Sequence, residues 1–209
     1  WNSKNIIFKA FEAVSIDKLN TILIGTAPYY TIRNNKPIGD GLAFSTSDNK
    51  LPIALESFYL SVEKDIYNGL NLNMEKQGNL QFLCNQGVML LNCSLTCEPG
   101  MPLIHFDLWK PFMKYFFKMI NETFSNLNLV FIGEETFEYT KLISEQKENF
   151  FLFPNQHYIY KVENSLYNLK TVKNIEELNI FSKINERLTQ TDGFIPIFWD
   201  YSEIKNVPF

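Results

Sequence analysis

The sequence predicts an α/β fold: a three-layer sandwich in which helices flank a central, mostly parallel, four-stranded sheet. Short, continuously apolar segments alternate along the chain with longer segments whose apolar residues recur at helical spacing. Strands that are apolar on both faces are typical of a parallel sheet that helices cover on both sides. No linker, repeat or low-complexity tract interrupts the 209 residues, so we expect residues 1–209 to form a single domain.

Four short apolar runs are the predicted strands of this sheet. They are Thr21–Gly25, Gly87–Asn92, Asn128–Gly133 and Phe150–Phe153. In open α/β sheets, ligands bind where the strands end and the loops begin. We therefore expect the functional residues to follow Ile24, Leu91 and Phe153.

Five segments are predicted to be helices, mainly from the spacing of their apolar residues. They are Ile6–Leu19, Glu56–Asn68, Leu108–Phe124, Thr136–Ser144 and Ile175–Leu188. Asp107 immediately precedes the third of them, where an acidic residue favours the start of a helix. The polar segment Thr26–Asp40 contains Pro28, Pro37 and Gly39, and we predict that it is a loop.

The composition limits the kinds of protein this chain can be. Its net charge of −4 and pI of about 5.3 argue against a generally basic surface, but they leave room for a local positive groove. Its three cysteines have no C-x-x-C spacing, so we expect free thiols in a reducing compartment and no metal site. No apolar run approaches the ~20 residues of a membrane-spanning helix and no secretory signal is visible, so we expect an intracellular protein, cytoplasmic or nuclear, without a membrane partner.

Several short motifs occur in a fixed order. Ile22–Tyr30 reads I-L-I-G-T-A-P-Y-Y, Gly41–Ser45 reads G-L-A-F-S, and Gln86–Asn92 reads Q-G-V-M-L-L-N. Phe181–Glu186 reads F-S-K-I-N-E, and Pro196–Trp199 reads P-I-F-W. They resemble, in the same order, the G-Q-D-P-Y-H, G-L-A-F-S, Q-G-V-L-L-L-N, F-S-K-T-N-E and P-I-D-W motifs of uracil-DNA glycosylases. The resemblance spans most of the chain and implies that family's fold and its place in DNA repair by base excision.

The resemblance also implies a pocket for a base that has been flipped out of the DNA helix. Phe44 would stack on the base, and Tyr29 would crowd the C5 methyl group of thymine. The Asn92 amide can donate to O4 and accept from N3–H of a pyrimidine. Without the resemblance, a phenylalanine after an apolar run is more often a core residue, and an asparagine at a strand end is more often a turn former.

Two further residues are candidates for binding the substrate. Thr26 precedes the alanine of the G-T-A-P loop, at a position where one branch of the superfamily has glutamate. Ser57 corresponds to a serine that pins a phosphate beside the target nucleotide, although Leu55 and Glu56 stand where the family has prolines. A glutamate beside a phosphate is unfavourable unless it points away.

The catalytic motifs differ from the family pattern. Ala27 stands where the main family has the aspartate that orients water, so we expect hydrolysis to be slow and Ala27→Asp to accelerate it. Asp40 could face the pocket and supply a carboxylate, or it could be a loop residue solvated by water. His157 lies about one residue from the position of the histidine that stabilises the leaving base, and the alternative is a structural or exposed histidine.

Two functions remain open from the sequence. The first is a glycosylase that excises uracil or a modified pyrimidine from DNA by hydrolysis, without cofactor or metal. The second is a catalytically impaired subunit that binds DNA or a protein partner in a replication or repair complex. A weaker third hypothesis is a pocket that recognises uracil without cutting.

Overall fold

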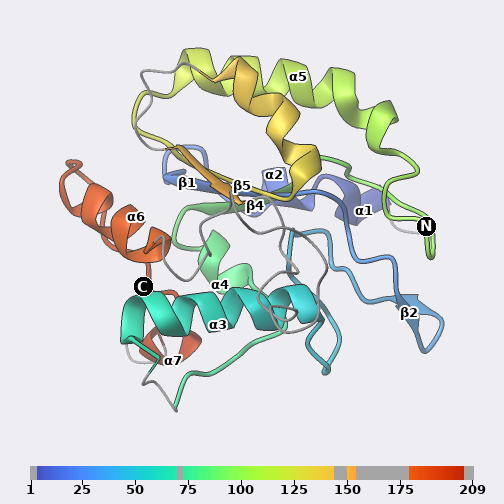
Figure 1. Ribbon diagram of the computed structural model, residues 1–209, viewed down its shortest axis with the longest axis horizontal. Helices are drawn as coiled ribbons and strands as arrows, with labels where there is room; N and C mark the ends of the chain where they lie inside the picture. The colour runs from blue at the N-terminus through green and yellow to red at the C-terminus, as the bar shows by residue number, and fades with distance from the viewer. Residues whose placement is uncertain (1–3, 70–72, 144–149, 154–178, 205–209) are drawn as a thin grey trace, which may run out of the picture.

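The computed structural model describes residues 4–69, 73–143, 150–153 and 179–204. A four-stranded sheet lies between two layers of helices, which confirms the predicted α/β sandwich (Figure 1). The strand order is β4-β1-β5-β6 and all neighbouring strands run parallel. The strands are β1 (Thr21–Gly25), β4 (Val88–Asn92), β5 (Asn128–Ile132) and β6 (Phe150–Phe153). Their carboxyl ends therefore lie at one edge of the sheet.

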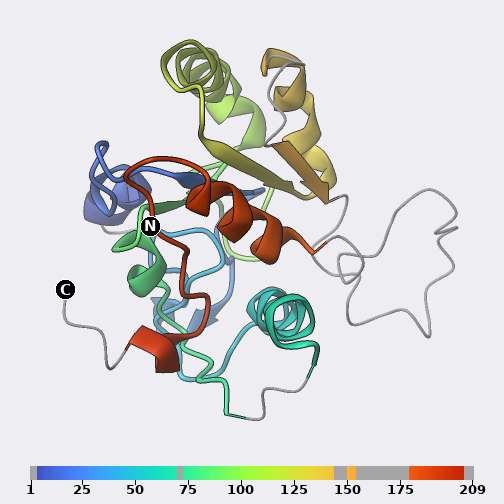
Figure 2. The ribbon, with the colours of Figure 1, turned by 90° about the vertical axis from the view of Figure 1, so that its left-hand side faces the viewer.

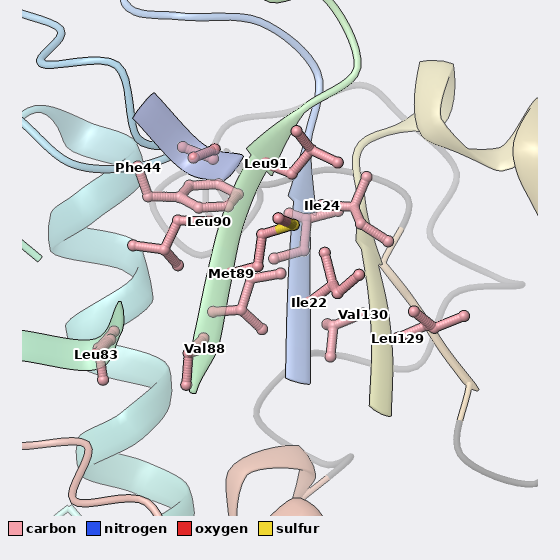
Figure 3. Close-up of a cluster of buried hydrophobic side chains, with 14 of the residues drawn as sticks. Ile22, Ile24, Phe44, Leu83, Val88, Met89, Leu90, Leu91, Leu129 and Val130 are labelled. Atoms are coloured by element: carbon pink, nitrogen blue, oxygen red, sulfur yellow. The ribbon is translucent and has the colours of Figure 1, made fainter. Parts of the chain in front are cut away.

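Burial on both faces explains why the first three strands are continuously apolar. Every residue of β1, β4 and β5 is buried, as expected for strands that helices cover on both sides. Figure 3 shows their side chains packed together, with the Phe44 ring beside β4. The register pairs Gly25 with Asn92, so the last residues of β1 and β4 lie side by side.

The helices form one layer on each face of the sheet. Figures 1 and 2 show α5 (Phe106–Thr123) and η1 (Glu134–Leu142) on one face, and α3 (Ile53–Tyr67) and α4 (Gln81–Cys84) on the other. The Phe117 ring of α5 packs 5.5 Å from Phe131 of β5 and 5.0 Å from Tyr139 of η1, measured between ring centroids. Aromatic contacts therefore fix this helical layer to the sheet.

Shorter elements complete the described chain. They are α1 (Lys4–Ile7), α2 (Lys9–Glu12), β2 (Ile32–Arg33), β3 (Lys36–Pro37), α6 (Ile180–Thr189) and α7 (Tyr201–Ile204). Helix α6 packs on α3 through Phe58 and Phe181, whose ring centroids are 5.4 Å apart. Helix α6, which carries the F-S-K-I-N-E motif, is thereby joined to the helical layer that contains α3.

The structure corrects three of the predicted elements. The helix predicted over Ile6–Leu19 is replaced by two short helices, α1 and α2, which are separated at Phe8 and end at Glu12. After them the Ser15 hydroxyl donates to the Asp17 carboxylate. The predicted loop contains the antiparallel β2-β3 hairpin, whose turn residues Asn34 and Asn35 have φ of 49° and 59°. Asparagine tolerates these left-handed conformations, and two of them in succession are typical of a tight hairpin turn.

The third correction concerns the segment after β5. A regular helix was predicted over Thr136–Ser144, but the structure has a 3-10 helix that begins two residues earlier, at Glu134. The Thr136 backbone N–H and hydroxyl both donate to the Gly133 carbonyl oxygen, at 3.1 and 2.7 Å, and these bonds start the tight turn directly at the strand end. Among the described helices, none is long and apolar enough to cross a membrane.

Candidate functional site

A cavity of about 250 Å³ opens at the carboxyl edge of the sheet. Its walls come from the loops after β1 and β5, the end of β4 and several side chains from elsewhere in the chain. They are Thr26, Ala27, Pro28, Tyr29, Tyr30, Leu42, Phe44, Ala54, Asn92, Pro102, Leu103, Gly133, Glu134 and Glu135. This volume lies below the ~300–1,000 Å³ of pockets for drug-sized ligands and suits a smaller ligand such as a single base.

The cavity lies where the connections between strands change from one side of β1 to the other. From β1 the chain crosses to β4 on one side, and then passes to β5 on the other side of β1. The loops after β1 and β5 therefore diverge and leave a crevice between them, which is the usual ligand site of an open α/β sheet. Both loops contribute to the cavity wall.

Gly25 brings the stacking ring and the amide together. A Cβ atom at Gly25 would lie 2.8 Å from Asn92 Oδ1 and 3.1 Å from Phe44 Cζ. The bare glycine backbone thus lets both side chains approach the end of β1. Only a residue without a side chain allows this arrangement at the cavity.

Backbone hydrogen bonds hold the loop after β1 against the end of β4. The Cys93 N–H donates to the Gly25 carbonyl at 2.8 Å, and the Ser94 N–H donates to the Thr26 carbonyl at 2.8 Å. The parallel pairing of β1 and β4 therefore continues beyond the last strand residues. It fixes the position of the Thr26–Ala27 peptide relative to Asn92.

Asn92 presents a nearly buried amide to the cavity. The residue is only 7% exposed, and its side chain has no hydrogen-bond partner among the residues that the structure describes. Buried side-chain amides in folded proteins are normally paired, because an unpaired one costs free energy. A ligand in the cavity that offers both an acceptor and a donor would satisfy the Asn92 amide.

Tyr29 supports the backbone that carries the Phe44 ring. Its hydroxyl donates to the Phe44 carbonyl at 2.9 Å, and Phe44 has φ of 65°, a left-handed conformation that is uncommon for an aromatic residue. Burial raises the pKa of the Tyr29 phenol well above its ordinary value, and the negative charge of Asp40 adds to the shift. The phenol therefore stays protonated and keeps its donor function at every ordinary pH.

Thr26 and Ala27 form the wall next to a carboxylate. The Thr26 side chain is buried, and its hydroxyl donates to Glu135 Oε2 at 3.1 Å. Ala27 is half-buried and offers only a methyl group. The cavity thus has a carboxylate beside the loop after β1. This carboxylate is that of Glu135, which belongs to the loop after β5.

Asp40 does not line this cavity, which corrects the hypothesis that it faces the base pocket. It borders a neighbouring cavity on the other side of Tyr29. Its carboxylate accepts hydrogen bonds from Ser45 Oγ at 2.7 Å and Asn79 Nδ2 at 3.1 Å, and Lys9 Nζ lies 3.5 Å away. Since its side chain is only 8% exposed, Asp40 is neither in the pocket nor solvated, and it holds the loop together.

Two other predicted residues are not among those that line the described cavity, Ser57 because of its place on α3 and His157 because the structure does not describe it. Ser57 is 1% exposed on α3, and its hydroxyl has no partner among the described residues. A hydroxyl that does not reach the surface is unsuited to the predicted phosphate contact. His157, the candidate for stabilising the leaving base, lies outside the described residues.

The cysteine thiols are protonated in the fold. Burial raises the pKa of the Cys93 thiol well above its usual range, and the negative charges of Glu138 and Glu135 contribute. Cys84 and Cys97 are also free and buried. Within the described residues, no three His, Cys, Asp or Glu side chains gather in a way that could hold a metal ion.

Glu135 is a chemically active cavity residue that was not among the residues predicted from the sequence. The sequence predicted functional residues after β1, β4 and β6, but not after β5. The signal was present, because Gly133-Glu134-Glu135 directly follows a buried strand at the same edge of the sheet. Polar residues at that position in a parallel sheet are candidates for the ligand site.

Comparisons with known proteins agree with this geometry. The chain matches no protein-family model. It is 33% identical over 155 residues to the uracil-DNA glycosylase of Mycoplasmopsis pulmonis, covering 74% of this chain and 66% of that protein. It is 30% identical over 198 residues to the uracil-DNA glycosylase of Campylobacter lari, covering 94% of this chain and 78% of that protein.

Other relatives match over a smaller part of their length. The uracil-DNA glycosylase of Borrelia turicatae is 32% identical over 133 residues, which are 63% of this chain and 56% of that protein. The matched region thus spans from somewhat over half to about four fifths of these three relatives. Among solved structures, the mimivirus uracil-DNA glycosylase has the same fold, with a TM-score of 0.78 at 21% identity over 93% of this chain and 72% of that chain.

Proposed function

The chain belongs to the uracil-DNA glycosylase family, and from this premise we propose that it binds DNA and excises a flipped-out uracil by hydrolysis of the N-glycosidic bond. The substrate is DNA that contains uracil or a modified pyrimidine, and the protein acts inside the cell, where that DNA is. The base enters the cavity between the loops after β1 and β5. Flipping is necessary because the bond to be broken cannot be reached inside a stacked duplex.

One observation carries the proposal: the nearly buried Asn92 amide opens into the cavity without a partner among the described residues. The amide N–H of Asn92 donates to O4 of uracil, and its oxygen accepts from N3–H. The Phe44 ring, held next to Asn92 at Gly25, stacks on the face of the base. Tyr29 lines the same cavity and limits the space beside C5, so a methyl group there is disfavoured.

An excision assay tests the function. Oligonucleotides with one uracil, single-stranded and double-stranded, are incubated with the protein and then treated with alkali, and a gel reveals cleavage at abasic sites. We expect cleavage at uracil and none in the matched thymine oligonucleotide. If no uracil substrate is cut, the proposed hydrolysis is wrong.

Asn92→Asp tests the base contact. The change keeps the side-chain shape but replaces the amide donor with a charged acceptor that repels O4 of uracil. Loss of the hydrogen bond and the unfavourable contact should reduce uracil excision and uracil-DNA binding by about 10-fold to 100-fold. Asn85→Asp is the control, since Asn85 is exposed at the end of α4 and its replacement alters net charge equally. Equal effects of the two variants would show that charge, and not base reading, is responsible.

The alternative function is a subunit that holds DNA or a protein partner in a replication or repair complex without cutting. It predicts binding of DNA or of a protein partner without the formation of abasic sites, whereas the weaker third hypothesis predicts preferential binding of uracil-containing DNA with the base left in place. Measuring binding and excision on the same oligonucleotides separates the two functions.

A further inference from the structure

The cavity has a carboxylate although the family's aspartate position is occupied by Ala27. Glu135 is half-buried in the cavity wall, and its Oε2 atom accepts a hydrogen bond from the Thr26 hydroxyl at 3.1 Å. Thr26 is the immediate neighbour of Ala27 in the loop after β1. The carboxylate therefore reaches the same wall of the cavity from the opposite loop.

The local fold holds Glu135 in this place. Gly133 has φ of 108°, which turns the chain sharply at the end of β5. A Cβ atom at Gly133 would lie 2.5 Å from Thr26 Oγ1 and 3.5 Å from Glu135 Oε2, so the glycine makes room for their contact. The hydrogen bonds from Thr136 to the Gly133 carbonyl then fix the turn that carries Glu135.

The arrangement leaves part of the carboxylate available. Of the described residues, Thr26 alone is hydrogen-bonded to the Glu135 side chain, and that bond uses Oε2. No lysine or arginine lines the cavity among the described residues, so no cation there neutralises the charge. Oε1 is thus open to a water molecule or a substrate.

We propose that Glu135 is the catalytic carboxylate of this protein, a role that rests on the glycosylase function proposed above. Breaking the glycosidic bond leaves positive charge on the deoxyribose, which a fixed carboxylate in a water-poor cavity stabilises. Thr26 orients the carboxylate through the Oε2 hydrogen bond. Ala27 leaves the space next to it open.

The reaction uses only water as the second reactant. The Glu135 carboxylate accepts a proton from a water molecule as the water oxygen bonds to C1′ of the deoxyribose. The C1′–N1 bond breaks, and its electron pair leaves with the base, which then takes a proton from solvent. The products are free uracil and an abasic deoxyribose, and Glu135 returns its proton to solvent.

Glu135→Gln tests this assignment. Glutamine keeps the shape and the oxygen that Thr26 contacts, but it carries no charge and cannot accept the proton from water. We expect the single-turnover rate of uracil excision to fall by about 10²- to 10⁴-fold. Affinity for DNA with a non-cleavable uracil analogue and the melting temperature should stay near those of the parent protein. Glu122→Gln, an exposed change on α5 with the same effect on net charge, should keep the parental rate.

Ala27→Asp supplies the second arm of the test. In the Glu135→Gln background it should raise the rate of uracil excision at least about 10-fold above that of the single variant, because the new carboxylate comes from the adjacent wall. In the parent it should give little gain, because a second carboxylate beside Glu135 repels the first. This expectation replaces the acceleration by Ala27→Asp that the sequence alone predicted. Glu135→Asp, which keeps the charge but withdraws it by one methylene, should give an intermediate rate.

The outcomes separate the two proposals. If the parent excises uracil and Glu135→Gln does so within about threefold of the same rate, the glycosylase function stands and the role of Glu135 is refuted. A loss of rate matched by an equal loss of analogue binding, or by unfolding, also refutes it, since Glu135 would then act on binding or stability. If the parent cuts no uracil substrate, the proposed function fails, and the role of Glu135 fails with it.

Discussion

Replacing Gly25 by alanine is expected to damage the base pocket while leaving the fold in place. The backbone of Gly25 does not lie in the left-handed region, so alanine can adopt it without strain. The added methyl group meets two side chains of the pocket instead, Asn92 at 2.8 Å and Phe44 at 3.1 Å. The Asn92 amide must retreat by about 0.6 Å to reach the 3.4 Å of an ordinary contact.

The size of the effect follows from these distances. Adding a methyl group to a packed site costs about 1–3 kcal/mol. Misplacing a positioning group by ~1 Å costs about 10²-fold in rate. A shift of about 0.6 Å of the Asn92 amide, together with about 0.3 Å of the Phe44 ring, should therefore cost about 10-fold to 100-fold. The fold has little reason to fail, because the atoms nearest to the methyl group are side-chain atoms of the cavity lining and not backbone atoms of the adjacent strand β4.

The measurement is the rate of uracil excision, or the affinity for uracil-containing DNA, together with the melting temperature. Gly39→Ala is the matched control, since a Cβ atom there would meet only Tyr29 atoms at 3.5 Å or more, which is ordinary contact. We expect Gly39→Ala to behave like the parent. A parental rate for Gly25→Ala would refute the argument that the glycine makes the pocket possible.

Two further predictions follow from the buried hydroxyl and thiol groups. Tyr29→Phe removes the 2.9 Å hydrogen bond to the Phe44 carbonyl and should cost about 1 kcal/mol of stability and several-fold in excision; an unchanged thermal melt would contradict this. Burial raises the pKa of Cys84 to about 12 and of Cys97 to about 11, whereas unfolded thiols titrate near ~8.5. Above that pH the unfolded chain loses thiol protons that the folded chain keeps, so the free energy of unfolding decreases as the pH rises. Urea titrations at pH values from 8 to 11 should show this decrease. The decrease should be less steep after Cys84 and Cys97 are both replaced by serine.

The strands could be predicted from the sequence because burial on both faces leaves a simple pattern. Thr21–Gly25, which is buried throughout, was predicted and found with the same bounds. The bounds of Phe150–Phe153 also agree with the prediction. Helix ends were less predictable, since they depend on local hydrogen bonds. Helix α3 begins at Ile53, three residues before the predicted start, because Pro52 supplies an extended N-cap.

The candidate site was predictable only in part. The family-like motifs drew attention to Tyr29, Phe44 and Asn92, and the structure places all three around one cavity, while their roles remain predictions. Glu135 contacts Thr26 across 109 positions of sequence, and this contact depends on how β5 pairs with β1. A local motif cannot encode such a contact, so the sequence pointed instead to Asp40, the carboxylate directly before the G-L-A-F-S motif.

The same geometry explains how a base pocket can persist when its usual carboxylate is absent. Reading a base needs fixed positions for a ring and an amide. The backbone bonds from Cys93 and Ser94 to the loop after β1 fix the end of β4 that carries the amide, and the Ala43 N–H bond to the Leu90 carbonyl ties the segment that carries the Phe44 ring to β4. Stabilising a cation needs only negative charge near the right point, because Coulomb interactions have no single required direction. Two loops diverge around the cavity, and either can bring a carboxylate to that point. The pocket residues are therefore tied to β1 and β4, whereas the charge is free to come from the end of β5.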